Sequence, residues 1–200
     1  MDYYELLVYA RTGCKDSVPT IFSSIDAWRN QDLIACTLLQ EDDAEILDKC
    51  NSLEWQMSDP KEMLTLLQQK ITKDFPEISD VSYEISNVDE ALEEFLSPAF
   101  YITAPLDNYN CNRIYINPAS MYADIYFFTT LAHEGYPGHL YQTIHSYDHG
   151  LAPIRCMLDY SGYTEGWATY VEFLSYAYAD IDPSIASFLS HNQSAILSLY

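Results

Sequence analysis

The sequence predicts a mainly helical fold of the α+β class with one small β-sheet. Apolar residues recur every three or four positions through most of the chain, which is the spacing of amphipathic helices. Two short segments alternate instead between apolar and polar residues, as half-buried strands do. Of the 200 residues, 48% are hydrophobic, which is enough for a compact domain with a sizeable core. We therefore expect a single domain over residues 1–200, in which a helical scaffold (1–80) precedes a region that carries the candidate site (81–200).

Helices are predicted over most of the first 80 residues. The apolar spacing is helical from residue 2 to about residue 57, and Gly13 separates a first short helix from the rest. The pair Asp59-Pro60 is typical of a helix start, because Asp caps the first turn and Pro fits the first helical position. This helix is expected to end before Pro76.

Two strands and three further helices are predicted after residue 80. The segments Val81–Ile85 and Arg113–Asn117 alternate like strands, and the stretches 97–98 and 105–112 between them resemble loops. The helices are expected at three places: from about Tyr122 to His133, from Thr164 to about Tyr178, and onward from the Asp182-Pro183 cap.

The charge of the chain excludes one class of partner. The formal net charge is -21, and beyond Lys73 the only cationic side chains are Arg113 and Arg155. Proteins that bind nucleic acids present basic surfaces to the phosphates, so we expect no nucleic-acid partner. A strongly negative chain attracts metal cations, although the net charge by itself indicates neither which ion binds nor where.

No targeting or membrane-spanning segment is predicted. The first ten residues lack the basic start and the apolar run of a signal peptide. The most apolar later run, residues 125–132, is much shorter than the roughly 20 residues that span a bilayer. We expect a soluble chain, for which a cytoplasmic location is slightly favoured and export of a longer protein stays open.

The cysteines predict neither disulfides nor a zinc knuckle, because they are scattered, odd in number and without a C-x-x-C pair. We expect them to be small hydrophobic residues of the core. They are Cys14, Cys36, Cys50, Cys111 and Cys156.

The segment that indicates chemistry runs from residue 131 to residue 142 and contains His133, Glu134 and His139. In an H-E-x-x-H helix the two histidines lie four residues apart and reach one metal ion. Here they lie six residues apart, which on a regular helix places them about 240° apart around the axis. They could not then share an ion. Because Pro137 cannot donate to the preceding turn and Gly138 tolerates unusual backbone angles, we predict that the helix is interrupted there.

A catalytic zinc site takes three protein ligands, so a third ligand is needed besides the histidines. Glu165 is the first candidate, in the segment Thr164-Glu165-Gly166-Trp167-Ala168, where the two small residues would permit a close helix approach. Glu172 lies two turns later on much the same face, and we expect it to hold a ligating histidine through its other ring nitrogen. Glu172 and Asp159 are also the alternatives to Glu165 as the ligand.

Other polar side chains near the motif have weaker claims. Three tyrosines lie close enough in sequence to donate a hydrogen bond to a tetrahedral oxyanion: Tyr141, Tyr160 and Tyr163. Three further histidines have no partner motif and are expected at the surface or in satisfied polar positions: His145, His149 and His191.

These motifs resemble those of the bacterial family of domain of unknown function 885 (DUF885). The resemblance rests on H-E-x-x-P-G-H at residues 133–139 and E-G-W-A at residues 165–168, and it is clearest over residues 97–178. It implies a helix-rich metallopeptidase-like protein of the gluzincin type, with a helical zincin-like fold around a zinc cleft. Family members are considerably longer, so the resemblance also implies that this chain is a catalytic segment. Many carry a second histidine directly after P-G-H, where this chain has Leu140.

The function predicted from these residues is zinc-dependent hydrolysis of peptide bonds. Zn²⁺, held by His133, His139 and Glu165, would polarise the carbonyl, and Glu134 would take a proton from metal-bound water and pass it to the leaving amine. The strand predicted at 113–117 could pair with an extended peptide substrate. Two alternatives stay open: a binding or structural module that retains the metal without turnover, and a hydrolase of non-peptide amides or esters.

Overall fold

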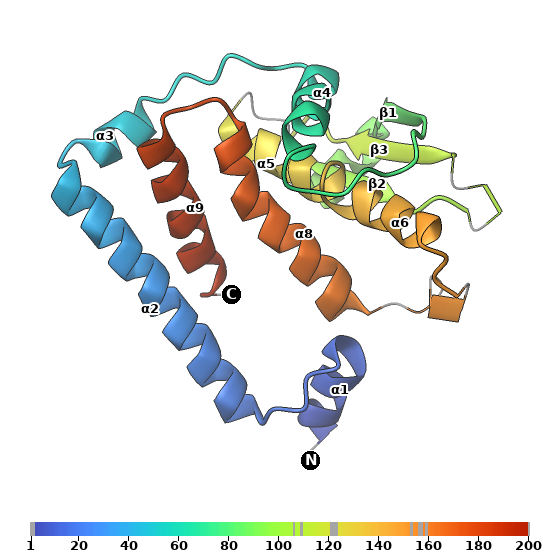
Figure 1. The fold of residues 1–200 in the computed structure, drawn as a ribbon, viewed down its shortest axis with the longest axis horizontal. Helices are drawn as coiled ribbons and strands as arrows, with labels where there is room; N and C mark the ends of the chain where they lie inside the picture. The colour runs from blue at the N-terminus through green and yellow to red at the C-terminus, as the bar shows by residue number, and fades with distance from the viewer. Residues whose placement is uncertain are drawn as a thin grey trace.

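The computed structural model describes residues 3–105, 107–108, 110–120, 124–152, 154–155, 158 and 160–199. Over these residues the chain is mainly helical with one three-stranded sheet, as the sequence predicts (Figure 1). The helices are α1 (Tyr3–Thr12), α2 (Val18–Asp42), α3 (Ile46–Asn51), α4 (Pro60–Ile71), α5 (Ile125–Glu134), α6 (His139–Asp148), α8 (Ser161–Ser175) and α9 (Pro183–Leu197), with short 3-10 helices η1 (Glu90–Phe95) and η2 (Tyr176–Tyr178). The strands are β1 (Tyr83–Asn87), β2 (Ala99–Ile102) and β3 (Asn112–Ile116).

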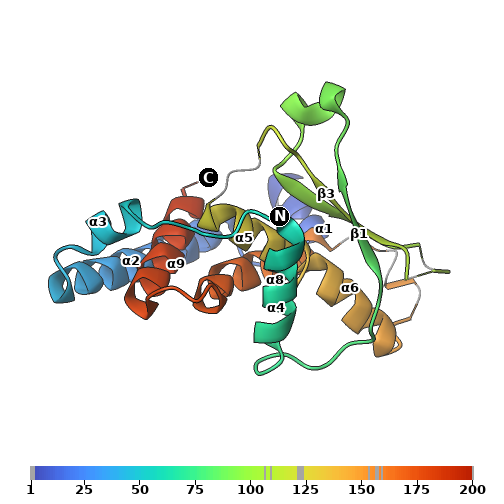
Figure 2. The same ribbon diagram turned by 90° about the horizontal axis from the view of Figure 1, so that it is seen from above.

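The elements form a row along the molecule. Helices α2, α3 and α9 lie at one end, the sheet lies at the other, and α5 and α8 run between them (Figures 1 and 2). Helix α2 packs against α9, while α5 packs against both α8 and β2. The core beside the sheet is built from side chains with no exposed surface, which include Leu64, Leu67, Ile114, Phe128 and Leu131. This packing fixes α5, the helix that carries the H-E pair, between the sheet and α8.

Capping residues set the helix starts where the sequence predicts them. Asp59 accepts a hydrogen bond from the N–H of Lys61 at the start of α4, and Asp182 does the same for Ser184 at the start of α9. The helix predicted from Thr164 begins slightly earlier, at Ser161. Of the helix predicted to approach His133, the expected start near Tyr122 lies outside the described residues, and α5 is described from Ile125.

The sheet has the order β1-β3-β2. The two predicted strands are present as β1 and β3, which pair in parallel, with Tyr83 opposite Asn112. Strand β2, which sequence reasoning did not identify, pairs antiparallel with β3, with Ala99 opposite Ile116. Strand β3 therefore has a neighbour on each side, so the prediction that residues 113–117 pair with a peptide substrate is wrong. The backbone groups of β3 already bind β1 and β2, and β2 is an edge of the sheet.

The prediction that the cysteines are core residues is only partly correct. Cys36 is buried, and Cys14 and Cys50 are half-buried, but Cys111 is exposed. All four of these are free thiols, and Cys156 lies outside the described residues. Within the described residues, no helix combines the length and the hydrophobicity that a membrane span requires.

The predicted interruption between the two histidines is confirmed, because α5 ends at Glu134 and α6 begins at His139. Gly138 packs directly on the end of α5: a Cβ atom added there would lie 1.7 Å from the carbonyl oxygen of His133 and 2.4 Å from that of Ala132. The indole Nε1 of Trp167 on α8 donates a hydrogen bond to the carbonyl oxygen of Pro137 at 2.8 Å. The turn is thus held from both sides, by its own backbone packing and by α8.

The glycine of the E-G-W-A segment has a different environment from the one predicted. Apart from the neighbouring backbone of its own helix, a Cβ atom added at Gly166 would meet no atom of the described residues within 4 Å, so Gly166 is not needed for a close helix approach. Ala168, by contrast, is completely buried, as such an approach requires.

We predict that Gly138→Ala lowers the free energy of unfolding by about 1–3 kcal/mol, the usual cost of overpacking, because the new methyl group meets backbone rather than a movable side chain. Urea denaturation followed by circular dichroism measures this. Gly166→Ala is the matched control: it adds the same methyl group in open space within a helix and is expected to stabilise by about 0.5–1 kcal/mol. Equal effects of the two substitutions would contradict the packing explanation.

Candidate metal centre

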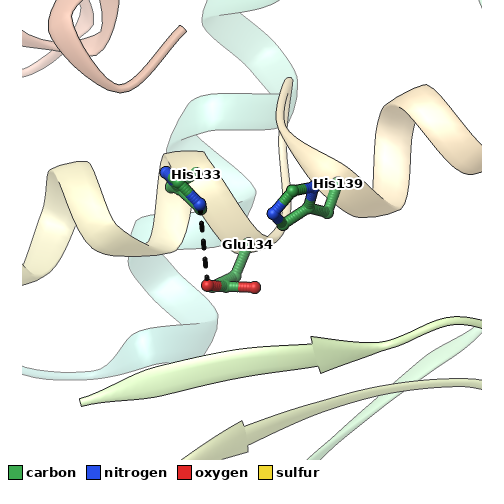
Figure 3. Close-up of side chains that lie close together, drawn as sticks. All are labelled: His133, Glu134 and His139. Atoms are coloured by element: carbon green, nitrogen blue, oxygen red, sulfur yellow. Dashed lines mark ion pairs between the residues drawn. The ribbon is translucent and has the colours of Figure 1, made fainter. Parts of the chain in front are cut away.

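The turn between α5 and α6 brings the three residues of the first motif together. His133 and Glu134 end α5 and His139 begins α6, and one potential ligand atom from each lies within 4.8 Å of the other two. The two imidazole rings are nearly perpendicular, with centroids 4.8 Å apart. In Figure 3 a nitrogen of each ring points toward the other ring, and the Glu134 carboxylate lies between the rings and the sheet. All three side chains are largely buried.

Glu165 reaches this cluster from α8. Its Oε2 lies 3.5 Å from Nε2 of His133, and its Oε1 lies 3.6 Å from Nε2 of His139. Its side chain is 60% exposed, so the carboxylate approaches the histidines from the solvent side. The predicted third ligand is therefore placed next to both histidines at once.

Glu172, two turns further along α8, contacts the other face of His133. Its Oε2 lies 2.9 Å from Nδ1 of His133. Because a carboxylate can only accept, Nδ1 carries a proton and donates it, so that in the neutral ring the lone pair of Nε2 is free. The free Nε2 is the atom that faces His139 and Glu165. The contact predicted for Glu172 is thus present in the structure.

Glu134 lies between the histidines and the edge of the sheet. Its Oε1 is 4.0 Å from Nε2 of His133, and its Oε2 accepts a hydrogen bond from the backbone N–H of Tyr101 at 2.8 Å. Burial raises the pKa of Glu134 to about 7, although the Tyr101 N–H opposes this shift by stabilising the carboxylate. A carboxyl group with a pKa close to neutrality is suited to exchanging protons.

The two histidines have different electrostatic surroundings. Burial alone would lower the pKa of His133, but the hydrogen bond to Glu172 and the nearby carboxylates raise it above the usual value. Burial lowers the pKa of His139, and the neighbouring His133 lowers it further. The lowered pKa favours the neutral form of His139, which is the form that binds metals.

The arrangement of donors fits a zinc ion. Zinc bonds of about 2.0–2.1 Å at tetrahedral angles place neighbouring ligand atoms about 3.4 Å apart. Each histidine nitrogen lies close to this spacing from one oxygen of Glu165, but from different oxygens: Oε2 is 3.5 Å from Nε2 of His133, and Oε1 is 3.6 Å from Nε2 of His139. Glu134 is further from His133, at 4.0 Å. The donor set of two imidazoles and one carboxylate is that of many catalytic zinc sites, with Glu134 as an additional carboxylate beside it.

Not every predicted residue lies at this site. Tyr141 is wrong as an oxyanion donor, because it is buried and its hydroxyl donates to the carbonyl oxygen of Pro76 at 2.7 Å. Tyr160 and Tyr163 are exposed at the start of α8, in the turns before Glu165, so their role stays a prediction. Asp159 lies outside the described residues.

The remaining histidines occupy positions of the predicted kind. His145 stacks between the rings of Tyr141 and His149, with centroids 5.9 and 4.1 Å away. The Nδ1 atom of His191 lies 2.8 Å from Oδ1 of the buried Asp32 and so joins α9 to α2.

Sequence reasoning missed two contributors to the site. The backbone N–H of Tyr101 went unnoticed because residues 99–102 form a strand of only four residues, too short to show a clear alternation. Trp167 belongs to the E-G-W-A segment, but its hydrogen bond to Pro137 joins residues 30 positions apart. The only signal for that bond was the presence of an indole N–H, which needs an acceptor when buried.

Comparisons with known proteins bear on the fold and the family. A crystal structure from Colwellia psychrerythraea, whose protein is provisionally described as a lipoprotein, matches 96% of this chain with a TM-score of 0.74 and 18% sequence identity. At this identity the likeness shows the fold alone. The chain spans 36% of the length of that protein. A comparison with the curated proteins gave no match. The model of the DUF885 family, described as bacterial protein of unknown function, matches residues 28–180. Because this match covers more than half of the chain, the chain belongs to the DUF885 family.

Proposed function

We propose that this chain carries the active site of a zinc-dependent hydrolase with a zincin-like arrangement, which cleaves peptide bonds. The observation that supports it most is the convergence of three side chains from three helices. The Nε2 atoms of His133 and His139 both lie about one ligand spacing from the carboxylate of Glu165. His133 is also held in the tautomer that leaves Nε2 available.

In this proposal His133, His139 and Glu165 hold the zinc ion. When bound, zinc supplies Lewis acidity, which polarises a carbonyl oxygen and makes water a stronger acid. His133 and His139 bind through Nε2, and Glu165 binds through the carboxylate that faces them.

Glu134 is the general base of the proposed reaction. Its carboxylate lies beside the histidines, and its longer distance to His133 suits a residue that faces the reacting water more than one that completes the ligand set. Oε2 is fixed by the N–H of Tyr101, so Oε1 is the oxygen in position to accept the proton from the attacking water. The same carboxyl group then returns the proton to the leaving amine.

Strand β2 is the proposed binding edge for an extended peptide. Tyr101 directs its N–H toward Glu134, which means that the edge of β2 away from β3 faces the site. Because Glu134 already accepts from the N–H of Tyr101, an extended peptide would pair with the remaining outward backbone groups of this edge, which would place its main chain beside the histidines. The sequence had suggested β3 as the strand that pairs with a peptide, and we now propose β2 for this role.

The proposal is compatible with two cellular locations: the cytoplasm, or outside the cytoplasm after export of a longer protein. The description of the C. psychrerythraea protein as a lipoprotein supports export.

The zinc site predicts a metal content of about one ion per chain for protein purified without chelator. We expect His133→Ala and His139→Ala to abolish stoichiometric zinc, because each removes a nitrogen ligand, and Glu165→Gln to weaken binding. Elemental analysis and calorimetric titration measure both. His145→Ala, on the same helix as His139 but outside the cluster, is the matched control and should keep its zinc. If all four variants retained the same zinc content, the proposed ligand set would be wrong.

For Glu134 we predict a loss of turnover without a loss of metal. Glu134→Gln keeps the size of the side chain but removes the base, and general acid–base catalysis typically contributes about 10²–10⁴-fold in rate. Peptide hydrolysis should be assayed in a full-length family member with the same motifs, because this chain spans 36% of the solved neighbour.

Two results would overturn the role of Glu134. A Glu134→Gln enzyme with bound zinc and the parent rate would require another base. Loss of zinc in Glu134→Gln, together with retention of zinc in Glu165→Gln, would mean that the two glutamates exchange roles.

A further inference from the structure

A chain of three hydrogen bonds runs from the interior of the protein to His133. One carboxylate oxygen of Glu172, Oε2, binds Nδ1 of His133, and the other, Oε1, accepts a hydrogen bond from Nε2 of Gln193 at 2.6 Å. The amide oxygen of Gln193 in turn accepts a hydrogen bond from the hydroxyl of Tyr176, also at 2.6 Å. Tyr176 is 1% exposed. Four elements therefore contribute to this series of hydrogen bonds: η2, α9, α8 and α5.

Each member of this chain has a fixed role as donor or acceptor. A carboxylate only accepts, so the NH₂ group of Gln193 must face Glu172 and its oxygen must face Tyr176. The opposite orientation would bring the amide oxygen against the carboxylate. With both of its oxygens engaged, the carboxylate of Glu172 is held in one rotamer, and that rotamer fixes the proton of His133 on Nδ1.

We propose that Gln193 is a positioning residue of the candidate metal centre, which acts through Glu172 to keep Nε2 of His133 unprotonated and directed at the ion. The proposal rests on the zinc site proposed above. In the hydrogen bonds of the described residues, Gln193 is connected to His133 through Glu172. Tyr176 supports it by orienting the amide, so the site depends on α9 although α9 supplies no ligand.

A role in helix packing is the alternative, and the neighbouring residue on α9 provides the comparison. Ser194 donates to Oδ2 of Asp32 on α2 at 2.6 Å, a bond of the same length that joins two helices away from the site. Gln193→Met removes the hydrogen bonds of Gln193 while keeping its length, and Ser194→Ala removes one interhelical hydrogen bond without involving Glu172.

Two measurements on the 200-residue chain test the proposal. Competition with a chromogenic chelator gives the Zn²⁺ dissociation constant, which we expect to rise about 10-fold in Gln193→Met, at the lower end of what loss of a ligand's supporting residue costs, and to stay unchanged in Ser194→Ala. Histidine-ring ¹H–¹⁵N correlation spectra of the metal-free protein, at a pH where the rings are neutral, report the tautomer. We expect His133 to be protonated on Nδ1 in the parent and in Ser194→Ala, and to be a mixture of tautomers in Gln193→Met.

The outcomes separate this proposal from the proposed function. An unchanged His133 tautomer in Gln193→Met, with or without weaker zinc binding, would assign Gln193 a structural role and overturn the inference. If the parent chain bound no zinc, the proposed function would fail, and the tautomer would still decide the role of Gln193. If Gln193→Met did not fold, Tyr176→Phe would replace it, with a smaller rise of the dissociation constant and the same change of tautomer expected. An unchanged tautomer in that variant would also overturn the inference.

Discussion

A continuous helix through His133 and His139 would direct the two side chains about 240° apart, so the candidate site depends on the contact that interrupts this helix. That contact is the packing of Gly138 against the carbonyl oxygens of Ala132 and His133, where a Cβ atom would not fit. It ends α5 at Glu134 and restarts the chain as α6 at His139. The two rings then lie next to each other, nearly perpendicular, with centroids 4.8 Å apart. Histidines six residues apart can come together only where the helix is interrupted, and the glycine permits this interruption.

Helix α8 provides the other half of the site. Glu165 lies beside both histidine Nε2 atoms, Trp167 donates to the turn at Pro137, and Glu172 accepts from Nδ1 of His133. Residues seven positions apart on a helix lie within about 20° of the same direction, which explains why Glu165 and Glu172 both reach the histidines. One straight helix thus fixes the turn, the proposed third ligand and the tautomer of one histidine.

The electrostatics of the site favour a cation. Three carboxylates lie beside two largely buried imidazoles: those of Glu134 and Glu172 are also largely buried, and that of Glu165 approaches from the solvent side. Burial raises the pKa of Glu134 to about 7, because the ionised carboxylate is less stable in this buried position than in water. A divalent ion would offset this loss of stability, since an opposite charge nearby stabilises the carboxylate form. The strongly negative net charge of the chain also attracts cations, but it does not define where a cation binds. The positions of the donor atoms define the candidate site.

The sequence by itself determined the features that depend on neighbouring residues. Asp59 and Asp182 mark helix starts because capping is local, and the break at Pro137-Gly138 follows from the angle per residue of a helix. Only the tertiary structure decided the rest. Strand β2 is too short to show a pattern, and it exists because β3 pairs with it. Tyr141, close to His139 in sequence, donates instead to Pro76, 65 residues away. Gln193 forms hydrogen bonds with Glu172 and Tyr176, which lie 21 and 17 positions away in the sequence. Such bonds depend on how the helices pack, and no local sequence pattern predicts them.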